Sequence, residues 1–258
     1  YGRRRVGKTY LVRQMFEKQF AICHTELSPF ELSAEKIADQ QLRAFYGSLV
    51  QYGSKLTGIP KTWFDAFDEL IRLLRNKQSK DKQVIFIDEL PWMDTPRSGF
   101  LTAFEHFWNG WGAHQDNLML IVCGSATSWI SDKLINNRVT NEIKLIPFTL
   151  GECEAFYKAN GIVMSRYEQL QCFMAIGGIP FYMSLLKRGV SLAQNIDMLF
   201  FSRSAKLKQE FARLYGSLFT NSEECEKIIR LLATKRQGYT RKEIAEKTGL
   251  PDGGGLSS

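Results

Sequence analysis

Residue types that build metal and disulfide sites are scarce in this sequence. Its 258 residues include only three histidines and five cysteines, and no two cysteines form a C-x-x-C pair. Without such spacing, neither a zinc site nor a disulfide framework is predicted. No apolar run is long enough to cross a membrane, and no signal-peptide core follows the arginine-rich start. These absences favour a cytoplasmic protein with reduced thiols and no membrane association.

The bulk composition is that of an ordinary globular protein. Hydrophobic residues make up 44% of the chain and charged residues 24%, and the length allows more than one domain. The net charge of +7 is compatible with nucleic-acid binding, although a solvated basic surface is the commoner explanation of so modest an excess.

One segment organises the rest of the chain: Gly2-Arg3-Arg4-Arg5-Val6-Gly7-Lys8-Thr9, which matches the phosphate-binding pattern G-x-x-x-x-G-K-[ST]. Gly2 and Gly7 allow tight turns that bring several backbone N–H groups close to one anion. Lys8 adds a positive charge for the β- and γ-phosphates, and Thr9 offers its hydroxyl to Mg²⁺ at a helix N-terminus. A chance match on a basic turn is the alternative. The motifs further along the chain favour a nucleotide site formed by this whole segment.

A helix is predicted directly after this loop. The apolar residues Tyr10, Leu11, Met15 and Phe16 recur at helical spacing and are expected to form its buried face, with Tyr10 also among the nucleotide contacts. A phosphate loop normally follows a buried strand, whereas only Tyr1 precedes it here. We therefore expect a fragment whose first strand is missing and which folds poorly by itself, because its sheet would have unpaired edges.

An acidic pair marks the end of a buried strand. The run Val84-Ile85-Phe86-Ile87 is apolar on both faces, as a strand of a parallel sheet requires, and Asp88 and Glu89 follow it. Carboxylates in such a position are costly unless a positive group meets them. This pattern is typical of a Walker B site, in which Asp88 holds Mg²⁺ and Glu89 orients and deprotonates the attacking water. A strand-end aspartate that caps the next turn is the alternative.

The next apolar run supplies a sensor candidate. Residues 118–123 predict a buried strand, which ends in Gly124-Ser125-Ala126-Thr127. In P-loop ATPases with a strand inserted between the two Walker strands, the polar tip of the inserted strand lies beside the γ-phosphate. Ser125 is therefore the first candidate and Thr127 the second. Either residue could equally cap a helix over residues 128–135.

Hydrophobic periodicity divides the chain into an α/β core and a series of helices. The core, residues 1–148, is predicted as a parallel sheet sandwiched between helices, and residues 149–220 as an all-α lid. Strands are predicted at 20–23, 84–87, 118–123 and 142–148, core helices at 34–50, 63–74 and 100–111, and lid helices at 151–160, 167–176, 181–187, 192–199 and 205–219.

The last segment, residues 221–258, is predicted as a truncated winged helix. A helix over residues 223–233 is followed by Thr240 and Glu243, which form a capping box, and by Gly249, which supplies a sharp turn. A second helix would begin near Asp252 and lie in a DNA major groove. A plain helical hairpin is the alternative.

Together these motifs resemble the archaeal-type ATPase family of prokaryotes, a branch of the STAND NTPases related to AAA+ ATPases, and most of all the versions from Bacteroides-like bacteria. The residues that carry the resemblance are Tyr1 to Thr9, Ile87-Asp88-Glu89, Cys123-Gly124-Ser125, Leu145-Ile146-Pro147-Phe148, Gly177-Gly178-Ile179-Pro180 and the 238–250 helix pair. The resemblance implies an ASCE-type P-loop core with ATP and Mg²⁺ as ligands, a helical lid and a winged helix. It also implies that Pro180 lies beside the adenine or ribose.

Two functions from different classes remain in view. The first is an ATPase conformational switch, in which lid closure relays the nucleotide state to the winged helix and Arg138, or else Arg203 or Arg213, meets the transition-state charge. The second is a nucleotide-regulated DNA-binding protein with incidental or no hydrolysis. A small-molecule kinase is a third option, which Glu89 disfavours because a glutamate after Asp88 suits water activation. A protein partner or an oligomer is compatible with any of these.

Overall fold

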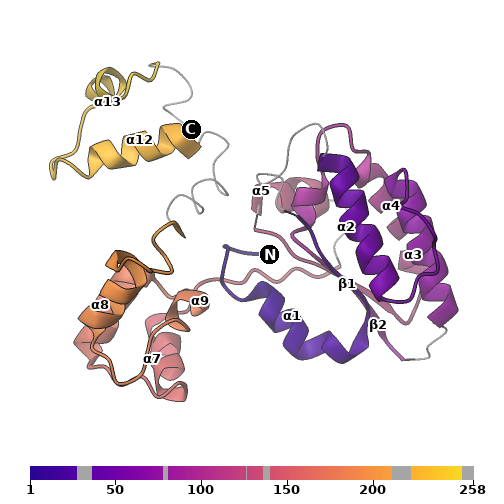
Figure 1. Ribbon diagram of the computed structural model, residues 1–258, viewed down its shortest axis with the longest axis horizontal. Coiled ribbons are helices and arrows are strands. Elements are labelled where there is room, and N and C mark those ends of the chain that lie inside the picture. Colours follow the sequence, from indigo (N-terminus) through magenta and orange to yellow (C-terminus); the bar gives the residue numbers. More distant parts are fainter. Residues whose placement is uncertain (28–36, 78–80, 126, 136–139, 211–221, 252–258) are drawn as a thin grey trace. The chain divides into compact units, whose positions relative to one another are not determined.

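The structure, a computed structural model, describes residues 1–27, 37–77, 81–125, 127–135, 140–210 and 222–251 (Figure 1). These residues divide into two compact units. The first contains Tyr1–Ala155 with Phe173–Ser184, and the second contains Phe156–Cys172 with Leu185–Ser258. Among the described residues, no helix combines the length and the apolar character needed to cross a lipid bilayer.

A parallel sheet forms the centre of the first unit, as the apolar runs predict. Its strands are β1 (Phe20–Thr25), β2 (Gln83–Asp88) and β3 (Leu118–Val122), in the order β1-β2-β3. The register places Thr25 beside Asp88 and Ile87 beside Val122, so the three strands end at the same edge. All six residues of β2 are buried, which is typical of a parallel strand covered on both faces.

Alternation along β2 sends its side chains to two different layers. Ile85 and Ile87 belong to a large apolar cluster with helices α2, α3 and α4, whereas Phe86 packs with Val12 of α1 and Cys123. Because the side-chain period of a strand is two, Asp88 faces the same side as Phe86, toward α1. Figure 1 shows α1 apart from the group formed by α2, α3 and α4.

Helix α3 illustrates how the large layer is specified. Thr62 and Asp65 bond to each other's backbone N–H groups at 3.0 and 3.2 Å, which fixes the start of the helix at Trp63. The rings of Trp63 and Phe67 are then fully buried and meet Phe100 of α4 at 5.0 and 6.1 Å between centroids. The aromatic residues of α4 therefore pack against neighbouring rings in the core.

The second unit contains short helices with well-formed caps. Ser191 and Gln194 form a capping box before α10, and the box predicted from Thr240 and Glu243 is present at the start of α13. Gly249 ends α13 with a left-handed φ of 71°, in the role predicted for it. Helices α12 and α13 contact each other. The predicted second helix near Asp252 lies outside the described residues.

Most predicted helices and strands are present, with boundaries that differ by a few residues. The described α-helices are α1 (Lys8–Phe16), α2 (Ile37–Gln51), α3 (Trp63–Lys77), α4 (Phe100–Gly110), α5 (Thr127–Ile130), α7 (Leu150–Ala159), α8 (Arg166–Ile176), α9 (Pro180–Met183), α10 (Leu192–Ile196), α12 (Ser222–Leu232) and α13 (Arg241–Thr248). The short 3-10 and π segments are η1 (Glu17–Gln19), η4 (Leu90–Met93), η5 (Gly112–His114), η6 (Ser131–Ile135) and η7 (Asp197–Phe201).

One predicted strand is wrong. Instead of a strand over residues 142–148, only Leu145 makes a parallel bridge, to Gly2. The amino group of Tyr1 also donates to the carbonyl of Ile143 at 2.7 Å. Of the helix predicted at 205–219, residues 206–209 form turns, Glu210 is helical, and residues 211–219 lie outside the described residues.

Candidate functional site

The phosphate loop closes into a compact turn around its own lysine. Gly7 has a φ of 94° and Arg5 a φ of 68°, both in the left-handed region, and Gly7 precedes the first residue of α1. The Lys8 ammonium is buried and donates to the carbonyls of Gly2 at 2.9 Å and Arg3 at 3.2 Å. A positive charge and the free N–H groups of a helix N-terminus therefore meet at one point, which is the arrangement that attracts phosphate.

Asp88 meets this loop from the sheet. Its side chain is buried, and its Oδ2 atom accepts a hydrogen bond from the Thr9 hydroxyl at 2.5 Å, across 79 positions of sequence. Its Oδ1 atom accepts from the backbone N–H of Glu89 at 3.1 Å. The alternation of β2 is what turns Asp88 toward α1. The two sequence motifs, far apart in the chain, thus form one site.

Glu89 leaves the strand in a strained conformation. Its φ of 53° and ψ of 42° are left-handed, which costs a residue other than glycine on the order of 1–3 kcal/mol. Its carboxylate Oε2 accepts from both the backbone N–H of Ser125 at 3.1 Å and the Ser125 hydroxyl at 3.0 Å. The turn therefore points the carboxylate away from the strand axis and toward the tip of β3.

Ser125 is held in place by the glycine before it. A Cβ atom on Gly124 would lie 2.7 Å from Cδ of Pro91 and 2.8 Å from Cδ1 of Ile130. A proline ring cannot move aside as a flexible side chain does, so only glycine fits there. Backbone bonds from Leu90 to Cys123 and from Cys123 to Ile87, both 2.9 Å, join the ends of β2 and β3. The structure thus brings Ser125 to Glu89, a pairing that the sequence did not predict.

Burial of the thiol next to this edge has a clear electrostatic effect. Burial, with a smaller contribution from the nearby carboxylate of Asp88, raises the pKa of Cys123 from 9.0 to about 12. The protonated thiol is a poor nucleophile. Cys123 therefore acts as a small apolar side chain, as predicted for a reduced core thiol.

The buried face predicted for α1 is partly wrong. Tyr10 is 69% exposed and Met15 is 62% exposed, and Leu11 is also exposed. Lys8 points into the phosphate loop, and this fixes which side of α1 faces inward. Val12 lies four residues later and therefore on the same side as Lys8. Val12 and Phe16 accordingly pack against the sheet.

The other predicted site residues lie in several different settings. Val6 is buried, Arg3 is exposed, and Arg4 is half-buried. Arg138 lies outside the described residues. Thr127 is the first residue of α5.

Pro180 begins α9, and the residue after it contacts the phosphate loop. The Arg5 guanidinium lies over the ring of Phe181, 4.1 Å from its centroid, and 5.8 Å from the centroid of Tyr182. Stacking of this kind contributes about 0.5–2 kcal/mol. That range is comparable to the cost of the left-handed backbone at Arg5, about 1–3 kcal/mol. Sequence reasoning missed Phe181, because no local pattern links an aromatic residue to an arginine 176 positions earlier.

The donor set fits Mg²⁺ bound together with a phosphate. No group of three or more histidine, cysteine, aspartate or glutamate side chains could hold a metal within the described part of the chain. Mg²⁺ does not require such a group, because it is usually held by one or two carboxylates, waters and the substrate's phosphates. The buried carboxylate of Asp88 beside the Thr9 hydroxyl meets this requirement.

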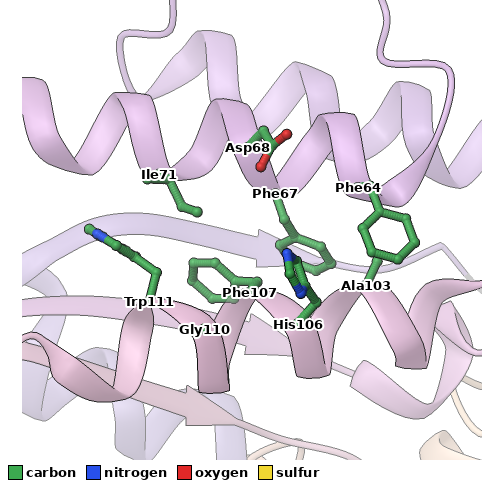
Figure 2. Close-up of a pocket in the computed structure, with 9 residues that line it drawn as sticks. All are labelled: Phe64, Phe67, Asp68, Ile71, Ala103, His106, Phe107, Gly110 and Trp111. Carbon is green, nitrogen blue, oxygen red and sulfur yellow. The ribbon is translucent and has the colours of Figure 1, made fainter.

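A separate cavity of about 140 Å³ lies between α3 and α4 (Figure 2). Its walls are mostly rings, from Phe64, Phe67, Phe107 and Trp111, and Asp68 lies on its exposed side. None of the predicted site residues lines it. The cavity is thus a gap in the aromatic layer and contributes nothing to the phosphate site.

A family model matches the part of the chain that contains both motifs of this site. The sequence model of the ATPase family associated with various cellular activities (AAA) matches residues 1–146. A solved structure, the Walker-type ATPase PABY2304 of Pyrococcus abyssi, is similar over 90% of this chain and 70% of its own length, with 18% identity and a TM-score of 0.48. A similarity of that size supports no further argument. The curated proteins give no match.

Proposed function

Because the chain belongs to the AAA family of ATPases, we propose that it binds MgATP between the phosphate loop and the end of β2 and hydrolyses it. The observation that supports this most directly is the 2.5 Å hydrogen bond from Thr9 to Asp88. It joins the Walker A and Walker B motifs at the position where a nucleotide-bound Mg²⁺ needs its two protein ligands.

Each residue of the site has a distinct task in this proposal. Lys8 holds a positive charge inside the loop for the β- and γ-phosphates, and the backbone N–H groups of the loop bind the same anion. Thr9 and Asp88 hold the metal, which neutralises charge on the phosphates when bound. The catalytic base is Glu89, which takes the proton from the attacking water, with its carboxylate oriented by Ser125.

We further propose that the ATPase is a conformational switch. The helical segments after residue 148 would respond to the nucleotide, with Pro180 beside the adenine or ribose. Arg138 is the proposed partner of the transition-state charge, where an arginine accelerates phosphoryl transfer by about 10³–10⁵. Membership of the STAND branch and the winged helix at residues 221–258 are part of this proposal.

Calorimetric titration with MgATP tests the binding step. Lys8→Ala is expected to weaken binding at least about 100-fold, because hydrogen bonds to charged groups are worth about 1.5–3 kcal/mol each and one side chain makes several. The exposed Lys158 of α7 provides a matched control, and Lys158→Ala should bind as the wild type does. Equal affinities of the wild type and Lys8→Ala would refute the proposed site.

A nucleotide-regulated DNA-binding protein is the second candidate function. Its support is a basic and aromatic group in the second unit, where the ammonium groups of Lys235 and Lys247 lie 4.9 and 5.9 Å from the ring centroid of Tyr239. Duplex DNA should then bind at least non-specifically, with Kd about 10⁻⁴–10⁻⁶ M, and more weakly as salt rises. Fluorescence anisotropy with labelled duplex DNA at low and high salt measures this. No binding at low salt would exclude it.

A further inference from the structure

A segment between the core and the helical region fastens the phosphate loop by its backbone. Leu145 forms a parallel bridge with Gly2, and its N–H donates to the Tyr1 carbonyl at 2.8 Å. Three residues later, the N–H of Phe148 donates to the carbonyl of Gly178 at 2.7 Å. Any Cβ on Gly2 or Gly178 would collide with backbone atoms of this segment. The start of the phosphate loop and the turn before α9 are therefore held by the same short stretch of chain.

A side-chain contact provides a second link between the phosphate loop and the segment that contains α9. Arg5, in the middle of the phosphate loop, stacks on Phe181, three residues after Gly178. Phe181 and Tyr182 pack edge to face, with centroids 5.8 Å apart, and Tyr182 is buried. The phosphate loop and the segment that contains α9 are thus linked in two ways. One link is the set of tight backbone contacts with residues 145–148, and the other is the cation–π stack. Of these two links, the cation–π stack is the one that can be lost without unfolding the phosphate loop or α9.

We propose that Arg5 and Phe181 act as a clamp through which α9 holds the phosphate loop in its anion-binding conformation. The inference rests on the proposed function, because it concerns the affinity of the same loop for nucleotide. Arg5 is a positioning residue here: its guanidinium lies on Phe181, and its backbone adopts the left-handed φ of 68° that the loop requires. A non-glycine residue keeps such a φ only where its surroundings hold it there.

A double-mutant cycle on the full chain tests the clamp. We expect Arg5→Ala and Phe181→Ala each to raise the Kd for MgATP about tenfold, equivalent to about 1.4 kcal/mol. Alanine adopts a left-handed φ no more easily than arginine does, so the strain at position 5 stays the same while the stack is lost. The double variant should bind no more weakly than either single variant, because the same contact is lost in all three. Additive losses in Kd would overturn the proposal.

Two further variants separate the clamp from a general effect on folding. Phe181→Trp keeps a face for the guanidinium and should retain wild-type affinity, whereas Phe181→Leu keeps the apolar bulk and should not. Phe201 is 75% exposed and lies in the other unit, so Phe201→Ala is the control and should bind normally. Circular dichroism melts of all variants without nucleotide should differ little. If Phe181→Leu binds as tightly as the wild type, the proposal is wrong.

Steady-state kinetics distinguish this proposal from the proposed function. Arg5→Ala and Phe181→Ala should raise KM and leave kcat unchanged, because Glu89 and Asp88 are untouched. If Lys8→Ala abolishes binding while these variants have no effect, the ATP site stands and the clamp falls. If the wild type itself fails to bind MgATP, both proposals fall.

Discussion

The two faces of the sheet are covered to very different depths. On one face, twenty of the described apolar residues, most of them from α2, α3, α4, β1 and β2, are buried in a single cluster. On the other face, the described residues form a cluster of only three, Val12, Phe86 and Cys123. The phosphate loop, Thr9 and Asp88 all belong to the thinner side. A thick layer supplies stability, and a thin layer leaves the loop room to respond to a ligand.

The difference between the two faces predicts that stability and nucleotide chemistry can be changed separately. Substitutions in the thick layer should change the free energy of unfolding and leave the nucleotide chemistry of the folded protein unaltered. Substitutions at the site edge should do the opposite, because these side chains contribute little buried apolar area.

Glu89→Gln should separate catalysis from stability most clearly. The amide keeps the shape of the side chain but cannot accept the proton of the attacking water, so kcat should fall by about 10²–10⁴. Single-turnover measurement of phosphate release gives the rate, and calorimetry should show unchanged MgATP affinity. Glu246 is exposed on α13, and Glu246→Gln is the matched control. An unchanged kcat in Glu89→Gln would remove Glu89 from the mechanism.

Phe67→Ala and Val12→Ala compare the two layers directly. Phe67 is 2% exposed and contacts five other rings, so its truncation should lower the free energy of unfolding by about 3–5 kcal/mol. Val12→Ala should cost about 1–2 kcal/mol, since it removes less buried surface. Urea denaturation measures both. If the cost of Val12→Ala equalled that of Phe67→Ala, the contrast between the layers would be broken.

Much of the core could be predicted from sequence, because local patterns determine it. The apolar run before Asp88 predicts a strand buried on both faces, and the glycines and Lys8 predict the loop. The exposure of Tyr10 was not predictable from periodicity. Several helical faces are compatible with the apolar pattern of α1, and the demand that Lys8 enter the loop selects one of them.

Contacts between distant segments account for the features of the site that the sequence did not predict. Nothing near Glu89 in the sequence indicates that Ser125 will hold it, and nothing near Arg5 indicates Phe181. Both contacts depend on how far a neighbouring element extends past the sheet edge, which no local pattern encodes. The strand predicted over residues 142–148 also depends on a distant partner, and of these residues only Leu145 makes a bridge, to Gly2.

Ser125→Ala tests one of these unpredicted contacts, with an effect smaller than that of Glu89→Gln. The backbone N–H of Ser125 still bonds to Glu89, so only the 3.0 Å hydroxyl bond is lost. We expect kcat to fall about tenfold with KM unchanged, since a hydrogen bond to a charged group is worth about 1.5–3 kcal/mol. Ser125→Thr keeps the hydroxyl and should recover most of the rate. A higher kcat in Ser125→Ala would show that the bond restrains Glu89 instead of orienting it.

The smallest effect concerns Cys123, in the thin layer itself. Its pKa in the folded protein is about 12, against an ordinary value of 9.0. Between these values the unfolded thiol loses its proton while the folded thiol keeps it, so the unfolded state is favoured as pH rises. The free energy of unfolding should therefore fall by at most about 1.4 kcal/mol per pH unit above pH 9, from this group alone.

Comparison with Cys123→Ala isolates that contribution. Lysine and tyrosine titration affects both proteins equally, so the difference between their slopes of unfolding free energy against pH, from pH 8 to 10.5, belongs to the thiol. Urea denaturation under reducing conditions measures it, and the wild type should lose stability more steeply. Identical slopes would mean that the thiol ionises as easily in the folded protein as in the unfolded chain. The thin layer would then admit water beside Asp88, and the contrast between the two faces would be sharper than the buried clusters indicate.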